Sequence, residues 1–303
     1  GFKFRRSAFR GQEPKVTLMA SPSLGIHDQA IPIDFSVNTM TPLYNAALVA
    51  ECAKIDPRAK ALILLVKRWA KDRGLCHAAK GHLPPYAWAL LAVYFMQVGY
   101  GGSPLLPSLQ GFKMASGPTL RRGPWPREAA VTDQRSVGNL FRDFVRFYSQ
   151  AVDFKAEAVS VRLGHCAPAS LHLTLQLVEH DDGSTEVGPS VEDPFEPSRN
   201  LGSNVTSNGF MRFREEFARA DSLLRGEANL QELLEPWVPV ERLRGDSEEA
   251  RAVADKGTAR YALLGKAADE LLQGTPDSSE DVEQVLRWIE EDERQERQRR
   301  AGE

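Results

Sequence analysis

The 303-residue sequence predicts an α+β fold, with a short β-sheet segment first and a mainly helical region after it. Three observations favour this fold: alternating apolar residues near the N-terminus, apolar helical patterns bounded by proline and glycine, and a length sufficient for a sizeable core. The 38 Lys and Arg residues nearly balance the 41 Asp and Glu residues, for a formal net charge of −3. This balance gives no whole-chain electrostatic case for binding nucleic acid or a membrane, and leaves room only for a local basic face.

Two short strands are predicted near the N-terminus, at residues 16–19 and 31–36, with a turn-rich segment at residues 21–25 between them. Two strands alone do not form a stable sheet, so the rest of the sheet is expected to be missing, supplied from elsewhere or never formed. Gly1 stands where an initiator Met would be expected. Both features suggest a chain that starts inside a longer reading frame.

Helices are predicted near residues 42–53, 57–73, 85–98, 136–152 and 209–224. Thr41 and Asp56 each precede a proline and are typical N-caps, while Gly74 and Gly99 stand where C-terminal caps would fall. The apolar run from residue 86 to residue 98 is shorter than the roughly 18 residues that span a bilayer. We therefore expect a buried helix there and no membrane partner.

The predicted helix at residues 57–73 has two different faces. Lys60, Lys67 and Lys71 share one side of it. The apolar side carries Leu62, Leu65, Val66 and Trp69. The three lysines form either an ordinary solvated surface or a clamp for a polyanion, because lysines one turn apart can approach one phosphate group as point charges.

Three other features carry weaker signals. Cys52, Cys76 and Cys166 are an odd number of cysteines at wide spacing, which favours reduced thiols in an intracellular protein. Cys76 lies close to two histidines, but the spacing fits no standard zinc pattern. The segment at residues 179–196 holds seven carboxylates and no Lys or Arg, which predicts a solvated loop.

Asp34 is the first candidate for catalytic chemistry. It lies in the second predicted strand, and its side chain points away from those of its apolar neighbours Ile33 and Phe35. One carboxylate on a strand proves little. It becomes a metal-site candidate if other carboxylates lie on adjacent strands, because two-metal sites need such clusters.

Ordered motifs run from about residue 30 to about residue 225. They occupy residues 32–38, 43–45, 56–58, 65–71, 83–88, 107–110, 141–164, 192–202 and 213–217. Together they resemble the RNA-terminal nucleotidyltransferases of the DNA polymerase β-like superfamily, which are the terminal uridylyltransferases and the untemplated poly(A) polymerases. The resemblance implies the C-terminal part of a nucleotidyltransferase palm sheet, followed by a mainly helical central domain with a PAP-associated region.

The resemblance also implies a role for individual residues. Asp34 would be the third metal-binding catalytic carboxylate, with Mg²⁺ (or Mn²⁺) as the cofactor, and Tyr86 would stack on the incoming base. Lys67 and Lys71 would contact the triphosphate, and Asn45 would contact the ribose or the base. The remaining nucleotide-binding candidates are Asn38, Asp193, Glu196 and Arg199. Phosphoryl transfer needs mainly positioning and charge neutralisation, so these residue types suit the chemistry.

The sequence departs from the family pattern at four places. The family's Gly-Ser motif and its first two catalytic aspartates have no counterpart in residues 1–32. Pro84 and Pro85 replace a Ser pair before Tyr86, and Ala46 replaces a common Thr. Arg199 stands where uridylyl-adding members usually carry His. These departures leave catalysis by this chain alone, and its choice of base, open.

We therefore predict three regions: a partial palm at residues 1–37, a helical domain with the PAP-associated region at residues 38–240, and a charged accessory tail at residues 241–303. The resemblance implies addition of UMP from UTP to an RNA 3′ end, with no DNA partner expected. The sequence shows no targeting signal, which makes the cytoplasm the default compartment. Addition of AMP from ATP and a non-catalytic nucleotide- or RNA-binding pseudoenzyme are the alternatives.

Overall fold

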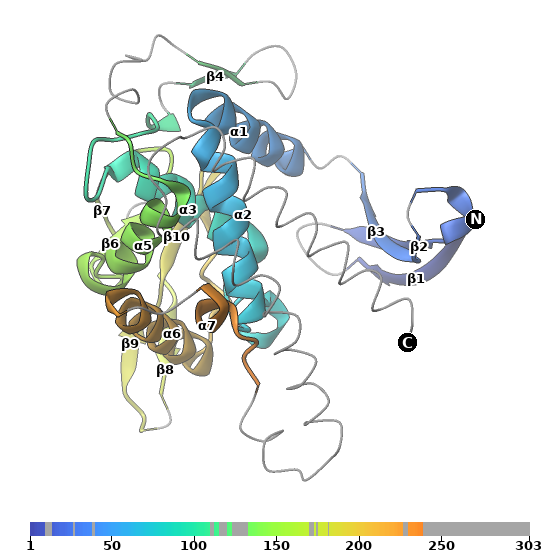
Figure 1. The fold of residues 1–303 in the computed structure, drawn as a ribbon. Helices are drawn as coiled ribbons and strands as arrows, with labels where there is room; N and C mark the ends of the chain where they lie inside the picture. Colours follow the sequence, from blue (N-terminus) through green and yellow to red (C-terminus); the bar gives the residue numbers. More distant parts are fainter. Residues whose placement is uncertain are drawn as a thin grey trace.

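The computed structural model describes most of the first 238 residues. These are residues 1–9, 14–26, 28–37, 40–109, 112–114, 120–122, 133–169, 173, 175–180, 182–226 and 230–238. Asn38 and the predicted tail at residues 241–303 lie outside them. A small N-terminal sheet stands beside a larger, mainly helical body (Figure 1). The predicted α+β class is confirmed, while the division into three regions stays a prediction.

The N-terminal sheet has three antiparallel strands in the order β1-β2-β3: β1 at Phe2–Ala8, β2 at Lys15–Ala20 and β3 at Ile31–Ser36. The two predicted strands are confirmed, and β1 is an additional strand that the sequence reasoning missed. Its alternation is interrupted by Arg5 and Arg6 next to each other, where the register of β1 against β2 shifts.

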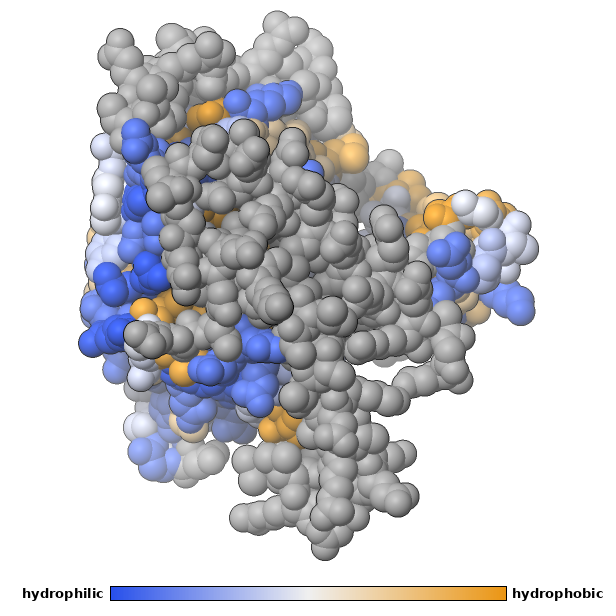
Figure 2. Space-filling model, viewed as in Figure 1, coloured by the Kyte–Doolittle hydropathy of each residue, from blue (hydrophilic) through white to orange (hydrophobic). Residues whose placement is uncertain are grey.

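The register of this sheet separates apolar from polar side chains, because successive residues of a strand point to opposite faces. Val16 pairs with Phe35, and Thr17 pairs with Asp34. One face carries Phe2, Phe4, Val16, Leu18, Ile33 and Phe35. The Phe2 and Phe35 rings are in edge contact at 6.4 Å. Figure 2 shows hydrophobic residues exposed on this sheet, at the right of the view.

The helical body contains all five predicted helices. They are α1 at Thr41–Ile55, α2 at Pro57–Asp72, α3 at Pro85–Val98, α5 at Val137–Arg146 and α6 at Ser207–Arg225. A π-helical turn at Phe147–Ala151 extends α5, two 3-10 turns lie at Pro22–Leu24 and Ala78–Lys80, and a short α7 covers Leu230–Leu234.

The predicted caps are partly confirmed. The Asp56 side chain accepts a hydrogen bond from the Arg58 backbone N–H at 2.9 Å, as an N-cap does. Gly99 ends α3 with a φ of 73°, in the left-handed region that glycine tolerates. The Thr41 prediction is wrong: α1 begins at Thr41 itself, and the Thr41 hydroxyl instead donates to Glu196.

An aromatic cluster holds the helices together. The Trp69 ring of α2 makes edge contacts with Trp88 of α3, Phe141 of α5 and Phe217 of α6, at centroid distances of 5.7, 5.9 and 5.0 Å. All four rings are buried. The predicted burial of residues 86–98 is confirmed for most of α3, and among the described residues no helix has the length and apolar character needed to cross a membrane.

The C-terminal half adds small sheets to the helices. A four-stranded sheet has the order β11-β10-β6-β7, with β6 at Glu157–Val159, β7 at Ala167–Pro168, β10 at Ser190–Asp193 and β11 at Glu196–Asn200. Two strand pairs complete the fold: β4 (Phe112–Met114) with β5 (Leu120–Arg122), and β8 (Leu177–Glu179) with β9 (Thr185–Val187).

The acidic segment at residues 179–196 is therefore not the solvated loop that its composition predicts. Glu192 is fully buried and accepts hydrogen bonds from Ser160 and from Arg162. Glu186 binds both guanidinium nitrogens of Arg214 at 3.0 Å and also pairs with Lys155. Because these partners lie far away in the sequence, the local excess of carboxylates gave no sign of them.

Candidate nucleotide site

The hairpin formed by β10 and β11 carries three of the candidate nucleotide-binding residues. Asp193 ends β10, and Glu196 and Arg199 lie on β11. Arg199 Nη1 is 3.7 Å from Asp193 Oδ2 and 3.7 Å from Glu196 Oε2. The structure therefore gathers these three charges into one cluster, as the resemblance implies.

Asp193 is a buried carboxylate with spare hydrogen-bonding capacity. Its exposed fraction is 1%, and its Oδ1 accepts a hydrogen bond from the Phe195 backbone N–H at 3.0 Å. Its Oδ2 has no hydrogen-bond partner among the described residues. Burial raises the pKa of Asp193, while the Phe195 N–H and the Arg199 charge act in the opposite direction. A ligand with an N–H group would supply the missing donor.

Helix α1 is attached to the same hairpin. The Thr41 hydroxyl donates to Glu196 Oε1 at 2.9 Å, and the Tyr44 ring lies 5.4 Å from the Phe195 ring. Asn45 follows directly on α1, and its side-chain Oδ1 is buried without a hydrogen-bond partner in the described chain. The sequence reasoning did not identify Thr41, Tyr44 or Phe195 as residues that position this site.

Tyr86 occupies the start of α3, after Pro84 and Pro85. Its hydroxyl is buried and lacks a hydrogen-bond partner among the described residues. The pKa of Tyr86 is raised, first by burial and then by the charge of Asp193, whereas Arg199 lowers it. The charges of Asp193 and Arg199 thus act on the Tyr86 hydroxyl in opposite directions.

Lys67 and Lys71 lie one turn apart on α2, the second of them exposed. Both act on Cys76, whose pKa is raised to about 11 because burial outweighs the opposing effect of the two lysine charges. Lys67 makes no ion pair with any residue in the described part of the chain, so its ammonium group is available to an anion. The predicted apolar face of α2 is confirmed, because Leu62, Leu65, Val66 and Trp69 are all buried.

Asp34 lies on the N-terminal sheet in an environment of donors. Thr17 donates to Asp34 Oδ1 at 2.5 Å, and the Lys15 ammonium lies 2.9 Å from Oδ2. These two contacts, together with the charge of Arg6 on β1, two strands away, lower the pKa of Asp34. The Arg6 Nε also approaches the Thr17 hydroxyl at 3.5 Å.

This environment does not fit a two-magnesium site. Asp34 is the single carboxylate on β1, β2 and β3, and both of its oxygens already accept protein hydrogen bonds. Two-metal sites need several carboxylates around the ions. No group of three or more His, Cys, Asp or Glu residues that could hold a metal ion occurs in the described ranges, Cys76 and its neighbouring histidines included.

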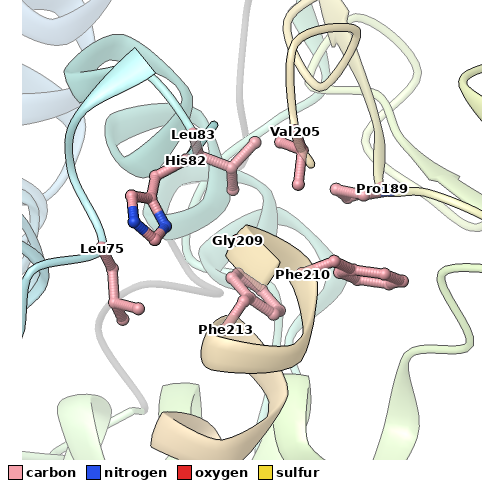
Figure 3. A pocket seen from close by; sticks show the side chains of 8 residues that line it. All are labelled: Leu75, His82, Leu83, Pro189, Val205, Gly209, Phe210 and Phe213. Carbon is pink, nitrogen blue, oxygen red and sulfur yellow. The ribbon is translucent and has the colours of Figure 1, made fainter. Parts of the chain in front are cut away.

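A hollow near the N-terminus of α6 is a different feature (Figure 3). It has no room for a water molecule and is lined by Leu75, His82, Leu83, Pro189, Val205, Gly209, Phe210 and Phe213. Burial and the nearby Arg212 charge lower the pKa of His82. The lining is apolar apart from His82 and contains none of the candidate nucleotide-binding residues, so the hollow is not the candidate nucleotide site.

Comparison with known proteins gives consistent results. No protein-family model matches the chain. The terminal uridylyltransferase cid1 of Schizosaccharomyces pombe is 28% identical over 213 residues, which cover 64% of this chain and 51% of cid1. The poly(A) RNA polymerase GLD2-A of Xenopus laevis is 26% identical over 209 residues, which cover 66% of this chain and 39% of GLD2-A. The chain thus spans about half the length, or less, of these relatives.

Solved structures show the same fold. A mutant of the Cid1 poly(U) polymerase bound to MgATP superposes with a TM-score of 0.62 at 24% identity, covering 78% of this chain and 72% of that one. Cid1 in complex with its short product ApU gives a TM-score of 0.59 at 24% identity, covering 78% and 73%. The resemblance to terminal uridylyltransferases and poly(A) RNA polymerases is confirmed.

Proposed function

We propose that this chain forms the nucleotide-binding part of an RNA 3′-terminal nucleotidyltransferase that adds UMP from UTP. Ten buried side-chain polar atoms have no hydrogen-bond partner among the described residues. The observation that carries the proposal is that three of them belong to the candidate nucleotide-binding residues: Asn45 Oδ1, the Tyr86 hydroxyl and Asp193 Oδ2. Buried polar groups are normally paired, and leaving one unpaired costs about 1–3 kcal/mol. A polar ligand that pairs them offsets this cost.

The resemblance to the relatives supports the proposal, because it expects nucleotide contacts from these same three residues. Tyr86 provides an aromatic ring for the base, and stacking of one base contributes about 1–3 kcal/mol. Lys67 and Lys71 provide two positive charges, one helical turn apart, for the triphosphate. The Asp193 carboxylate accepts a hydrogen bond from the uracil N3–H, and the Arg199 guanidinium donates to uracil carbonyl oxygens. Asn38 stays a predicted contact, because it lies outside the described residues.

The proposal includes a divalent metal ion but assigns it no ligands in this chain. The related Cid1 structures include complexes with MgATP and MgGTP, so a divalent ion suits the proposed reaction. In this chain Asp34 alone does not supply the ligands that two ions need. We therefore assign magnesium-dependent chemistry to a protein that adds further carboxylates to the palm, and derive no catalytic step from Asp34.

Adenylyl addition is the second candidate, because Arg199 stands where uridylyl-adding members of the family usually carry His. A guanidinium has donors only, so it cannot accept a hydrogen bond from the adenine amino group. The carboxylates of Asp193 and Glu196 can accept from that group, however. Uridylyl addition is the better-supported choice, because Arg199 lies 3.7 Å from both carboxylates and adds donors for the uracil carbonyl oxygens beside them.

Calorimetric titration of the purified chain with UTP tests the proposal. We expect UTP binding that is weakened by Tyr86→Ala and by Lys67→Ala. Tyr100→Phe is a matched control, because Tyr100 packs on Phe147 at 5.3 Å in a different part of the core. If UTP does not bind, or if Tyr86→Ala binds it as well as the unmodified chain does while remaining folded, the proposed nucleotide site is wrong.

A further inference from the structure

The sheet face that carries Asp34 also carries a row of cations. Lys3 lies opposite Met19 and Arg6 lies opposite Thr17 in the β1–β2 register, so both share a face with Thr17 and Asp34. Arg5 points to this face as well, because its Nη1 is 3.9 Å from Met19 Sδ. Lys15 completes the row through its ion pair with Asp34. We call Lys3, Arg5, Arg6 and Lys15 the basic sheet face.

Most of these charges are not neutralised. Only Lys15 is paired with a carboxylate, and neither Lys3, Arg5 nor Arg6 forms an ion pair with any residue of the described ranges. All three are exposed. Four cations against the single carboxylate of Asp34 make this face strongly positive, although the whole chain has a formal net charge of −3. A positive face on an acidic protein attracts polyanions locally.

We propose that the basic sheet face binds the phosphate backbone of single-stranded RNA and holds it beside Asp34. The inference rests on the proposed function, which supplies a reason for RNA to be present. Lys3 and Arg6 are three residues apart on an extended strand, or about 10 Å, so they suit separate phosphates of one RNA strand better than one small anion.

The opposite face of the sheet defines the kind of recognition. The aromatic rings of the sheet, those of Phe2, Phe4 and Phe35, lie on the apolar face and not among the cations. The basic sheet face therefore has no ring on which a base can stack, and its contacts go to phosphates. Phosphate contacts position a nucleic acid without reading its sequence. Binding is thus independent of base and strongly dependent on salt.

The register also places a cation of β1 in line with Asp34. Arg6, Thr17 and Asp34 form a line from β1 through β2 to β3. Thr17 is 2% exposed and donates to Asp34, so this line is a rigid part of the face. A strand held by the β1 cations passes within reach of Asp34, the carboxylate that the resemblance assigns to catalysis.

Fluorescence anisotropy with labelled oligouridylate and oligoadenylate, in EDTA, tests this proposal on the whole chain. We expect equal affinity for the two oligonucleotides and a log–log salt slope of about −2 to −3, corresponding to three or four phosphate contacts. Lys3→Glu and Arg5→Glu should each weaken binding several-fold and reduce the slope by about 0.7. Lys80→Glu, an equal charge reversal at an exposed lysine of the helical body, should leave binding unchanged.

The controls separate this proposal from its rivals. The sheet variants should keep the circular dichroism spectrum and the UTP affinity of the unmodified chain, so a loss of RNA binding alone identifies the sheet. Equal weakening by Lys80→Glu, or undiminished binding in Lys3→Glu and Arg5→Glu, would overturn the assignment. Preferential binding of phosphatidylserine vesicles over RNA would also overturn it and indicate a membrane surface. Failure of UTP binding with RNA binding intact would count against the nucleotide site only.

Discussion

Arg199 and Asp193 face each other across the β10–β11 hairpin, with Arg199 Nη1 3.7 Å from the Asp193 Oδ2 that accepts no hydrogen bond from the described residues. At this distance the guanidinium stabilises the charge of the carboxylate without occupying its hydrogen-bonding position. The base edge of a nucleotide can therefore use both groups at once. This relationship makes Arg199 the residue on which base choice is expected to depend.

We predict that Arg199→Ala lowers the preference of the chain for UTP over ATP. The substitution removes donors that serve the uracil carbonyl oxygens and leaves the Asp193 and Glu196 carboxylates, which can accept from the adenine amino group. The chain is incubated with UTP and ATP at equal concentration, and the ratio of bound UTP to bound ATP is measured. Arg214→Ala, which changes a guanidinium on α6 that pairs with Glu186, is the control. An unchanged ratio would reject Arg199 as the selector.

The raised pKa of Asp193 predicts that the stability difference between the Asp193→Asn variant and the unmodified chain depends on pH. Asp193 holds its proton in the folded chain at pH values where the unfolded chain, with a pKa near 3.8, has lost it. Unfolding then releases a proton, so this residue lowers the free energy of unfolding as the pH rises through that window. Asp193→Asn cannot ionise and keeps an acceptor for the Phe195 N–H. The free energy of unfolding of Asp193→Asn, relative to the unmodified chain, should therefore increase with pH.

Urea unfolding of both proteins from about pH 4 to about pH 8 measures this difference. Glu196→Gln, at a carboxylate of the same hairpin that is 46% exposed, is the matched control and should show a smaller change. The prediction is contradicted if the free energy of unfolding of Asp193→Asn, relative to the unmodified chain, stays constant or decreases as the pH rises.

The two α2 lysines should act on phosphates and not on bases. We expect Lys67→Ala and Lys71→Ala to weaken the binding of UTP and of ATP to the same extent, and to leave the affinity for uridine nearly unchanged. Lys60→Ala is the natural control, because Lys60 is an exposed lysine on the same helix, two turns from Lys67. Titration with UTP, UMP and uridine distinguishes the cases. Equal losses for all three ligands would indicate misfolding, and no loss would indicate a solvated surface.

How much of this structure the sequence reveals depends on the range of the interaction. The α2 face was predictable because Leu62, Leu65 and Trp69 repeat at helical spacing, and Asp56 caps the helix through its own local backbone. Strand β1 was missed because two adjacent arginines interrupt its alternation at the register shift. That shift is defined by pairing with β2 and not by β1 itself.

The candidate site shows the same division. Tyr86 and Lys67 carry a local pattern that a family resemblance can identify, whereas the contact of Thr41 with Glu196 joins residues 155 positions apart. Asp34 was correctly placed on a strand, but its neighbours Lys15 and Thr17 come from β2. Whether those neighbours were carboxylates or cations depended on register, which two short strands do not determine on their own.

Tyr86 offers a test that separates stacking from hydrogen bonding. Its buried hydroxyl has no hydrogen-bond partner among the described residues, so Tyr86→Phe should leave the free energy of unfolding unchanged or slightly increase it. Tyr86→Ala should weaken the binding of UTP by about 1–3 kcal/mol through loss of stacking. If Tyr86→Phe weakens UTP as strongly as Tyr86→Ala does, the hydroxyl and not the ring carries the contact. Thermal unfolding and titration of the two variants make the comparison.

The environment of Asp34 predicts that this chain on its own does not extend RNA. Its carboxylate accepts from Thr17 and Lys15, Arg6 lies one strand further on, and neither β1 nor β2 contributes a second carboxylate. In-line displacement with two metal ions requires carboxylate ligands on both ions. A metal ion at this site would find only the Asp34 carboxylate, which Thr17 and Lys15 already share, and the two nearby cations Lys15 and Arg6. Incubation of the chain with labelled UTP, magnesium and a short RNA should give no longer product. An Asp34→Asn variant should bind UTP as the unmodified chain does. An extended product that disappears in Asp34→Asn would show that Asp34 suffices as the palm carboxylate, and that Lys15 moves aside when the metal binds.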